Sequence, residues 1–314
     1  MMAGEGGFRV GRQPAAMSRA TAYAVTAVTY VAAGLAALLV VVATGGWHPL
    51  AVTLAADLVA TVVVFAATAA VANASLYDPY WSVAPSFAVA GWVVYDHATG
   101  AGAVPARQAL VLVLVLLWAL RLTLNWAVSW RGMDHEDWRY VQLREQTRGV
   151  VPWWLVSLAG IQLMPTLVVF AALLAVWPAV AVPGAPLGPL DAVAALVTAS
   201  AIVVEAVADR QLRRFTGDPA NRGAVIDRGL WRHSRHPNYL GEIMFWWGLW
   251  LFGLAAAPGW WWTVAGPVLM VLLFTVVSVP MMDRRSLQRR PGYAGHMRRV
   301  PGLFPRLPVP RRDR

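Results

Sequence analysis

The sequence predicts an all-α protein, a polytopic transmembrane helix bundle of seven or eight spans with both termini in the cytoplasm. Hydrophobic residues make up 58% of the 314 residues, charged residues make up only 13%, and the mean hydropathy is +0.54. An ordinary soluble domain is about 25% charged, so the composition excludes a secreted, cytosolic or disordered protein. Cysteine is absent, which excludes disulfides, thiol nucleophiles and Cys-ligated metal centres.

Eight apolar runs approach the roughly 20 residues that a spanning helix needs. The third run is short and contains Pro85, and the fifth contains Pro165. A kinked span is tolerated where neighbouring helices satisfy the freed backbone groups, so a count of seven and a count of eight both stay open. The expected spans are 21–43, 50–73, 81–95, 108–126, 152–177, 189–208, 239–256 and 260–281.

The basic residues, all of them arginine, set the expected orientation. If the N-terminus lies inside, the inside segments carry 24 of the 26 basic residues. Arg121 lies near the inner end of the fourth span, which leaves Arg107 as the only arginine expected in an outer loop. This asymmetry is the positive-inside pattern, and it explains the net charge of +10 without a nucleic-acid partner. The inside segments are 1–20, 74–80, 127–151, 209–238 and 282–314.

The chain is expected to form one domain. Residues 1–20 are rich in glycine and are expected to be a disordered arm, residues 21–304 the transmembrane domain, and residues 305–314 a basic tail. The first apolar run is too long for a signal-peptide core and lacks a small-residue cleavage site, so a removable signal peptide is not expected.

The strongest polar motif leads into the seventh span. Pro237 suits the first turn of a helix, which places Arg235 and His236 at a helix N-terminus, where free N–H groups favour a phosphate. Asn238 and Glu242 share one face a turn deeper and could bind an amide or a ribose hydroxyl. The alternative is a positive-inside loop with a helix cap. Glu242 speaks against that alternative, because a carboxylate entering an apolar span needs a partner.

A second group lies at the inner end of the sixth span, where Glu205, Asp209 and Arg213 follow one another at intervals of four. They share one helical face, so either they bind a ligand together or they pair with each other at the end of the helix. Glu205 is the most informative member, because it would face lipid unless it had a polar partner.

A third group begins at the inner end of the fourth span, with Arg121 and Asn125, and continues beyond it with Arg131, Arg139 and Tyr140. Acidic, basic and aromatic residues are interleaved here, which is typical of an amphipathic surface helix. The functional alternative is that the arginines and the tyrosine hold phosphates or stack on a nucleobase.

Two further segments could contribute to a site. Asp78 and Tyr80 lie in the turn before the third span, where a carboxylate and a phenol could protonate a substrate oxygen or the tyrosine could simply anchor the chain at the interface. Tyr293 and Arg298 belong to a basic stretch that could bind a cofactor or anionic lipid.

Several common chemistries have no motif in this sequence. The six histidines form no metal set and no HExxH occurs. Neither GxGxxG after a strand nor GxSxG is present, which argues against a Rossmann domain and an α/β-hydrolase.

The segment Arg-His-Pro-Asn-Tyr-Leu-Gly-Glu at 235–242, with Trp-Trp-Gly at 246–248, Asp-Trp-Arg-Tyr at 137–140 and the stretch 280–301, resembles the steroid 5-alpha-reductase superfamily. More closely, it is similar to the uncharacterised bacterial branch of these 3-oxo-5-alpha-steroid 4-dehydrogenase-like membrane reductases. The resemblance covers about residues 74–305.

This resemblance implies a bacterial inner-membrane enzyme that reduces a conjugated carbon–carbon bond of a hydrophobic enone with NADPH entering from the cytoplasm. The family polarises the ketone with a glutamate of an early helix and a tyrosine of the next. The only acid of the second span, Asp57, is expected near its outer end, so Tyr80 with Asp78 is predicted to take this role. The phosphates of NADPH are expected among Arg213, Arg235 and Arg298. The predicted cofactor-binding residues are Asn125, Arg131, Arg139, Tyr140, Glu205, Asp209, Arg213, Arg235, His236, Asn238, Tyr239, Glu242, Tyr293 and Arg298.

Two alternatives stay open. The Arg-His-Pro-x-Tyr element is also similar to that of isoprenylcysteine and phospholipid methyltransferases, which bind S-adenosylmethionine. Those enzymes pair it with Glu-Glu and with two tyrosines three apart, whereas this chain has Met282-Asp283, Tyr293 and His296. The second alternative is a non-catalytic membrane protein that binds a lipid or a partner. The expected partners are the bilayer and a hydrophobic small-molecule or lipid substrate.

Overall fold

The computed structural model describes residues 17–305, and within this range all regular structure is helical. Seven segments are long and apolar enough to cross a membrane, which confirms the predicted all-α transmembrane bundle. These segments are α1 Arg19–Ala43, α2 Pro49–Val71, α4 Pro105–Ser129, the continuous Trp153–Leu173 (α6, η2 and α7), α9 Pro189–Gly217, α10 Pro237–Ala256 and the continuous Pro258–Arg289 (η5, α11, η6 and α12). The shorter elements are η1 Ala74–Tyr77, α5 Trp138–Thr147, α8 Trp177–Ala181, η3 Pro219–Asn221, η4 Gly229–Arg232 and α13 Tyr293–Arg299.

An additional long helix, α3 Tyr80–Thr99, corresponds to the predicted third span. It begins one residue before and ends four residues after the expected 81–95, and Pro85 lies inside the helix without ending it. The turn before it, η1, is entirely buried. Helix α3 therefore begins within the bundle, which places its first residue, Tyr80, beside α2 and not at the bundle's end.

Two spans contain a widened π-helical turn before a proline. Ser157–Leu163 precedes Pro165, and Leu273–Ser278 precedes Pro280. A proline ring collides with the carbonyl four residues earlier in a regular α-helix, and a π-turn in that position relieves the collision while the helix continues. The predicted kink at Pro165 is thus accommodated within one span.

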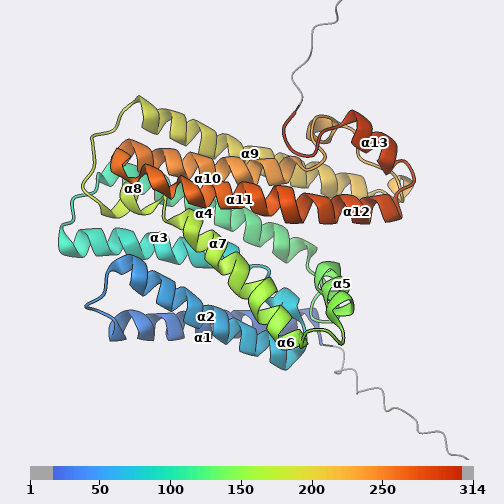
Figure 1. Ribbon diagram of the computed structural model, residues 1–314, viewed down its shortest axis with the longest axis horizontal. Helices are drawn as coiled ribbons and strands as arrows, with labels where there is room; N and C mark the ends of the chain where they lie inside the picture. Colours follow the sequence, from blue (N-terminus) through green and yellow to red (C-terminus); the bar gives the residue numbers. More distant parts are fainter. Residues whose placement is uncertain (1–16, 306–314) are drawn as a thin grey trace, which may run out of the picture.

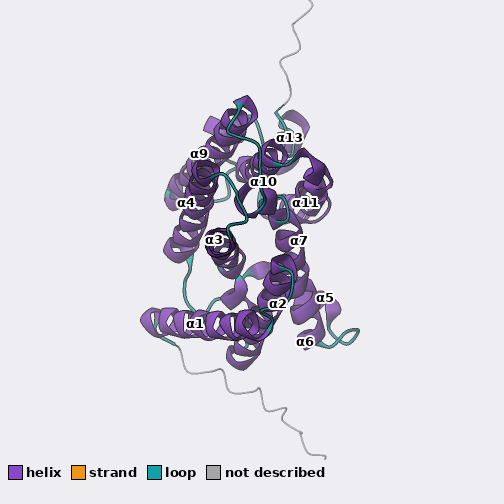
Figure 2. Cartoon of the chain, turned by 90° about the vertical axis from the view of Figure 1, so that its left-hand side faces the viewer, coloured by secondary structure: helices purple, strands orange, loops and turns teal. Residues whose placement is uncertain are grey.

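The helices form a layered bundle in which successive spans run in opposite directions (Figure 1). Helices α1 and α2 lie on one side, α3 and α7 lie in the middle, and α4, α9, α10 and α11 lie on the other side (Figure 2). Both ends of the described range lie at the same end of the bundle, next to α5 and α13 (Figure 1). We call it the basic end, because it carries 131–148, 210–235 and 284–299, where the described arginines concentrate.

Which face of the membrane the basic end occupies stays a prediction. Helix α1 begins at Arg19 with Ser18 as its N-cap, so the last residues of the predicted arm are ordered. The rest of that arm and nearly all of the predicted tail lie outside the described residues.

Helices α9 and α10 pack closely because glycines of α10 leave room for α9. A Cβ added at Gly241 would lie 2.3 Å from Cγ of Glu205, and one added at Gly248 would lie 2.2 Å from Oγ1 of Thr198. Small residues at such crossings let helix backbones approach each other in membranes. This contact brings the polar residues of α9 and α10 together.

Arg107 is placed differently from the sequence prediction. It lies in the first turn of α4 and is completely buried, not in an outer loop. Its Nε and Nη2 donate to the two carboxylate oxygens of Asp191 at 2.7 and 2.9 Å, and its Nη1 donates to the carbonyl of Ala185 at 2.9 Å. A paired guanidinium can be buried where a lone one cannot, so Arg107 ties α4 to the start of α9 at the end opposite the basic end.

Candidate active site

Three helices bring together a buried cluster of acidic residues beneath the basic end. Arg121 of α4 pairs with Glu205 and, at 3.0 Å, with Asp209, both on α9. Nδ2 of Asn238, on α10, donates to Asp209 at 3.4 Å. The prediction that Glu205 requires a polar partner is confirmed, and that partner is Arg121. The acids of α9 pair with α4, and not with Arg213 on their own helix.

Glu242 completes this cluster from α10 and has two tryptophan donors. The indole N–H of Trp118 donates to Oε2 at 3.0 Å, and that of Trp246 donates to Oε1 at 2.8 Å. All three side chains are buried. The sequence prediction did not include either tryptophan. Trp246 was recognisable four residues after Glu242 on the same helical face, whereas Trp118 comes from α4.

The cluster has more carboxylates than cations and retains unused hydrogen-bonding groups. Glu205 and Asp209 share the half-buried guanidinium of Arg121, while the buried Glu242 accepts from the two tryptophans. Nε of Arg121 and Oε1 of Glu205 are buried without a hydrogen-bond partner. Buried polar atoms are nearly always paired in native proteins, so a polar ligand with both a donor and an acceptor would suit this place. Arg213 donates to Asn125 at the edge of the cluster.

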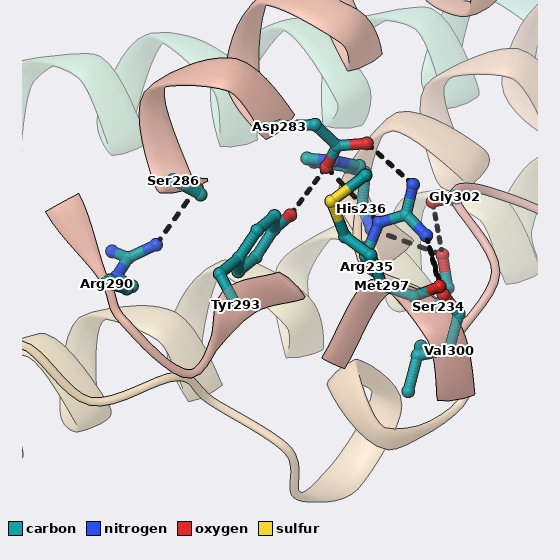
Figure 3. Close-up of polar contacts among 10 residues, drawn as sticks. All are labelled: Ser234, Arg235, His236, Asp283, Ser286, Arg290, Tyr293, Met297, Val300 and Gly302. Atoms are coloured by element: carbon teal, nitrogen blue, oxygen red, sulfur yellow. Dashed lines mark hydrogen bonds and ion pairs between the residues drawn. The ribbon is translucent and has the colours of Figure 1, made fainter. Parts of the chain in front are cut away.

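A second group surrounds Asp283 of α12 (Figure 3). Its carboxylate accepts hydrogen bonds from Arg235 Nη2 at 2.6 Å and from the Tyr293 hydroxyl at 2.5 Å, and it lies 2.9 Å from His236 Nε2. Arg235 also donates to the carbonyl of Val300 at 2.6 Å. Burial and the nearby Asp283 carboxylate raise the pKa of Tyr293 above its usual range.

The prediction that Arg235, His236 and Tyr293 face a cofactor does not agree with this arrangement. Their polar atoms are directed to Asp283 and to carbonyls of the C-terminal segment (Figure 3). The backbone N–H groups of Arg235 and His236 donate to the carbonyls of Pro301 and Gly302 at 2.9 and 3.1 Å. The group therefore fastens the C-terminal segment to the start of α10. Tyr239, one turn later, stacks on His236.

A third group joins α5 to the turn before α3. The hydroxyl of Tyr140 donates to Asp78 at 2.5 Å, and Arg139 pairs with Asp137 at 2.8 Å and approaches Asp78 at 3.9 Å. Burial raises the pKa of Asp78 to about 6, against the opposing charge of Arg139. Arg139 and Tyr140 thus bind protein carboxylates, and Arg131, like Arg298 of α13, is an exposed side chain.

The remaining predicted pair, Tyr80 and Asp78, is not assembled. The Tyr80 hydroxyl instead donates to Oδ1 of Asp57 at 2.6 Å. Asp57 was expected near the outer end of the second span and out of reach, but α3 begins inside the bundle and brings Tyr80 to it. The Asp78 carboxylate accepts its hydrogen bond from Tyr140 instead. The predicted pairing of Tyr80 with Asp78 is therefore wrong, and the acid in contact with Tyr80 is Asp57, which the prediction set aside.

Asp57 and Tyr80 lie in the wall of a cavity of about 750 Å³ between α1, α2 and α3. Most of its lining is apolar or aromatic, and Tyr30 and Trp92 also contribute. The lining includes Val31 and Phe87, which are 62% and 74% exposed on the outer surface of the bundle. The cavity is thus a largely apolar chamber with one strong hydrogen-bonding pair, next to surfaces that would contact lipid.

Two tryptophans connect the start of α3, beside this cavity, to the acidic cluster. Trp81, the neighbour of Tyr80, lies 6.2 Å from Trp118 between ring centroids, and Trp118 donates to Glu242. Among residues 17–305 no set of three or more potential ligands is arranged to hold a metal ion.

Comparison with known proteins identifies the family of this chain. The chain is 26% identical over 259 residues to an uncharacterized protein of Schizosaccharomyces pombe, a region that covers 75% of this chain and 73% of that protein. No solved structure matches it. Residues 64–300 match the family described as "Protein of unknown function (DUF1295)". Because this match extends over well more than half of the chain, the protein is an integral membrane protein of the DUF1295 family.

Proposed function

We propose that this protein is a membrane-embedded, NADPH-dependent reductase of a conjugated carbon–carbon double bond in a hydrophobic enone. The observation that carries the proposal is the contact between Tyr80 and Asp57 at 2.6 Å in the wall of the large cavity. The steroid 5-alpha-reductase superfamily, which the sequence resembles, uses an acid of an early helix with a tyrosine of the next. Asp57 on α2 and Tyr80 on α3 have that relationship.

The cavity supports a substrate with a long apolar body and one polar acceptor. Apolar side chains line it, and the pair of Asp57 and Tyr80 is the main polar feature of its wall. Its position beside Val31 and Phe87 allows a lipid-soluble molecule to enter from the bilayer. A carbonyl oxygen placed at Tyr80 would be the polar end of such a molecule.

The protonation of Asp57 controls what Tyr80 can do. A tyrosine hydroxyl has one hydrogen, and in the observed contact that hydrogen points to Asp57. If Asp57 is itself protonated, it donates to the Tyr80 oxygen and frees the Tyr80 hydrogen for the substrate oxygen. An enolate forming there would be stabilised by roughly 3–4 kcal/mol from one well-placed donor.

The acidic cluster fits the polar parts of NADPH. When bound, NADPH would supply a hydride to the β-carbon of the enone. The unpaired Nε of Arg121 and Oε1 of Glu205 offer a donor and an acceptor for the ribose or the carboxamide, and Asn238 adds an amide. Arg213 and the exposed Arg298 suit the phosphates. This assignment places the cofactor at the basic end, which the arginine distribution predicts to be cytoplasmic.

The first test is native mass spectrometry of the full chain with NADPH and S-adenosylmethionine offered in competition. The proposal predicts selective NADPH binding, reduced at least tenfold by Asn238→Ala and unchanged by Gln142→Ala, an exposed control on α5. Preferential binding of S-adenosylmethionine would overturn the reductase proposal in favour of a methyltransferase. Binding of neither would favour a non-catalytic lipid-binding protein.

A further inference from the structure

The cavity that contains Asp57 and Tyr80 is elongated along the bundle. Its lining covers positions 30–41 of α1 and positions 80–95 of α3. Both helices run from the basic end toward the opposite end (Figure 1). At 1.5 Å per residue these stretches are about 17 and 22 Å long. The hydrocarbon core of one leaflet is about 15 Å thick, half of a bilayer core, so the cavity is long enough for a whole lipid chain.

The two ends of the cavity differ in polarity. At the end nearest the basic end, the Tyr30 hydroxyl donates to the carbonyl of Leu76 at 2.9 Å, and its ring packs edge-on against Tyr80 with 6.0 Å between centroids. Farther along, the indole N–H of Trp92 donates to Oγ1 of Thr53 at 2.8 Å, so these two groups already satisfy each other. A ligand with a carbonyl at one end and an apolar tail therefore fits best with its carbonyl at Tyr80.

The glycines of this cavity differ from those that let helices pack closely. A Cβ added at Gly248 would lie 2.2 Å from Oγ1 of Thr198, whereas one added at Gly34 of α1 or at Gly91 of α3 would meet nothing within 4 Å. Gly34 and Gly91 both line the cavity. Apart from proline, glycine is the least favourable residue in a helix interior. Its use at two positions without a close helix contact favours a role in keeping the cavity open.

We propose that Gly34 and Gly91 are specificity-determining residues, which keep the cavity open for the unbranched tail of a chain-type enone. This inference rests on the proposed reductase function and adds the shape of the substrate to it. Gly34 lies about 6 Å beyond Tyr30 along α1, and Gly91 lies about 16 Å beyond Tyr80 along α3. With the substrate carbonyl at Tyr80, Gly34 is beside the first part of the tail and Gly91 is beside its far end. A larger side chain at either position shortens the tail that fits.

The position of the tail can be tested without catalysis. The probes are two saturated straight-chain methyl ketones, one with a photoreactive diazirine at the end of its tail and one with the diazirine next to the carbonyl. With the full chain in lipid nanodiscs, we expect the first probe to label residues 45–52 and 91–95, and the second to label the surroundings of Tyr30 and Tyr80. Excess unlabelled ketone should abolish this labelling, whereas an alkane of equal length should not. Labelling of the same residues by both probes, or equal competition by the alkane, would overturn the oriented tail.

The role of the two glycines is tested by chain-length selectivity with NADPH and straight-chain 3-alken-2-ones. For tails that approach about 15 Å, Gly91→Leu should lower kcat/KM about tenfold to a hundredfold, while short tails stay within about twofold. Gly34→Leu should cause such a loss for all but the shortest tails. The matched control is Gly160→Leu, because Gly160 is an exposed glycine of η2 outside the cavity whose added Cβ also meets nothing within 4 Å. It should change no tail length.

Retained activity on short enones shows that each variant is folded. An equal loss for short and long tails in Gly91→Leu would overturn the length-setting role. Faster turnover of a 4-en-3-one steroid than of every chain enone, unaffected by Gly91→Leu, would also overturn it and leave the reductase proposal standing. If the wild-type protein binds no NADPH and reduces no enone, the reductase proposal fails, and the labelling pattern still decides whether the cavity holds an oriented chain.

Discussion

The hydroxyl of Tyr80 donates to Asp57, 23 positions earlier in the chain, although Asp78 is only two positions away. The reason lies in the backbone, because the buried turn η1 directs the chain back into the bundle before α3 begins. Asp78 stays at the basic end and accepts from Tyr140. Asp57, which is distant from Tyr80 in the sequence, is therefore its hydrogen-bond partner, whereas the nearby Asp78 is the partner of Tyr140.

We expect Tyr80→Phe and Asp57→Asn each to lower kcat for enone reduction by about 10²- to 10³-fold, because each removes the acid or the group that controls it. The dissociation constant for NADPH should stay within about twofold, since neither residue contacts the acidic cluster. Steady-state kinetics and NADPH titration in nanodiscs measure both quantities. Asp78→Asn is the matched control, and a loss as large as that of Asp57→Asn would return the acid role to Asp78.

The apolar runs predicted every long helix of the bundle, because a spanning helix is defined by its own local composition. The limits of the third helix were the weakest, since Pro85 was taken as an interruption. Pro85 is the sixth residue of α3, and the helix continues through it although one intrahelical hydrogen bond is lost.

The candidate site was predictable only within single helices. The spacing of Glu205 and Asp209 correctly placed both on one face, but their partner, Arg121, is 84 and 88 positions away. Similarly, Arg235 was assigned to a phosphate because Asp283 follows it 48 positions later and was not visible as its partner. Long-range pairing depends on which helices are neighbours, and periodicity gives no information on that.

We expect Arg121→Met to destabilise the protein strongly, because it removes the ion-pair partner of the buried Glu205 and Asp209. Breaking a buried pair by removing one partner costs about 3–5 kcal/mol. The free energy of unfolding can be measured by denaturant titration in mixed micelles. The control is Arg131→Met, an exposed arginine in the loop after α4, which should change it by less than about 0.5 kcal/mol. Equal stability of the two variants would mean that the cluster is solvated in the membrane.

Arg235→Gln and Asp283→Asn should have the same effect, which is release of the C-terminal segment. Each change breaks the contacts that join α13 and residues 300–302 to the start of α10 (Figure 3). We expect faster hydrogen exchange in residues 290–303 and a double mutant no worse than either single mutant. If Arg235→Gln instead abolished NADPH binding while Asp283→Asn did not, Arg235 would contact the cofactor directly.

Asp78 should make the stability of the protein fall as pH rises. Its pKa is raised by burial to about 6 in the folded protein, whereas it is about 3.9 in an unfolded chain. Between these values the folded state binds more protons than the unfolded state, so the free energy of unfolding decreases with pH, by up to about 3 kcal/mol. Asp78→Asn should therefore flatten the profile between pH 4 and pH 7 and raise the unfolding temperature at pH 7.5. Asp227→Asn, at an exposed position, should not.

Gly248→Ala should separate α9 from α10, whereas Gly34→Ala should be tolerated. In a helix, alanine is favoured over glycine by about 1 kcal/mol, so the sign of the effect depends on the space available. A Cβ at Gly248 would lie 2.2 Å from Oγ1 of Thr198 and 2.9 Å from its backbone nitrogen, while a Cβ at Gly34 would meet nothing within 4 Å. The backbone of α9 cannot rotate away as a flexible side chain could.

We therefore expect a lower unfolding temperature for Gly248→Ala and an unchanged or higher one for Gly34→Ala. NADPH binding should weaken in the first variant alone, because the same helix contact aligns Glu205 with Glu242, and an undiminished affinity would show that the cluster tolerates a wider helix spacing.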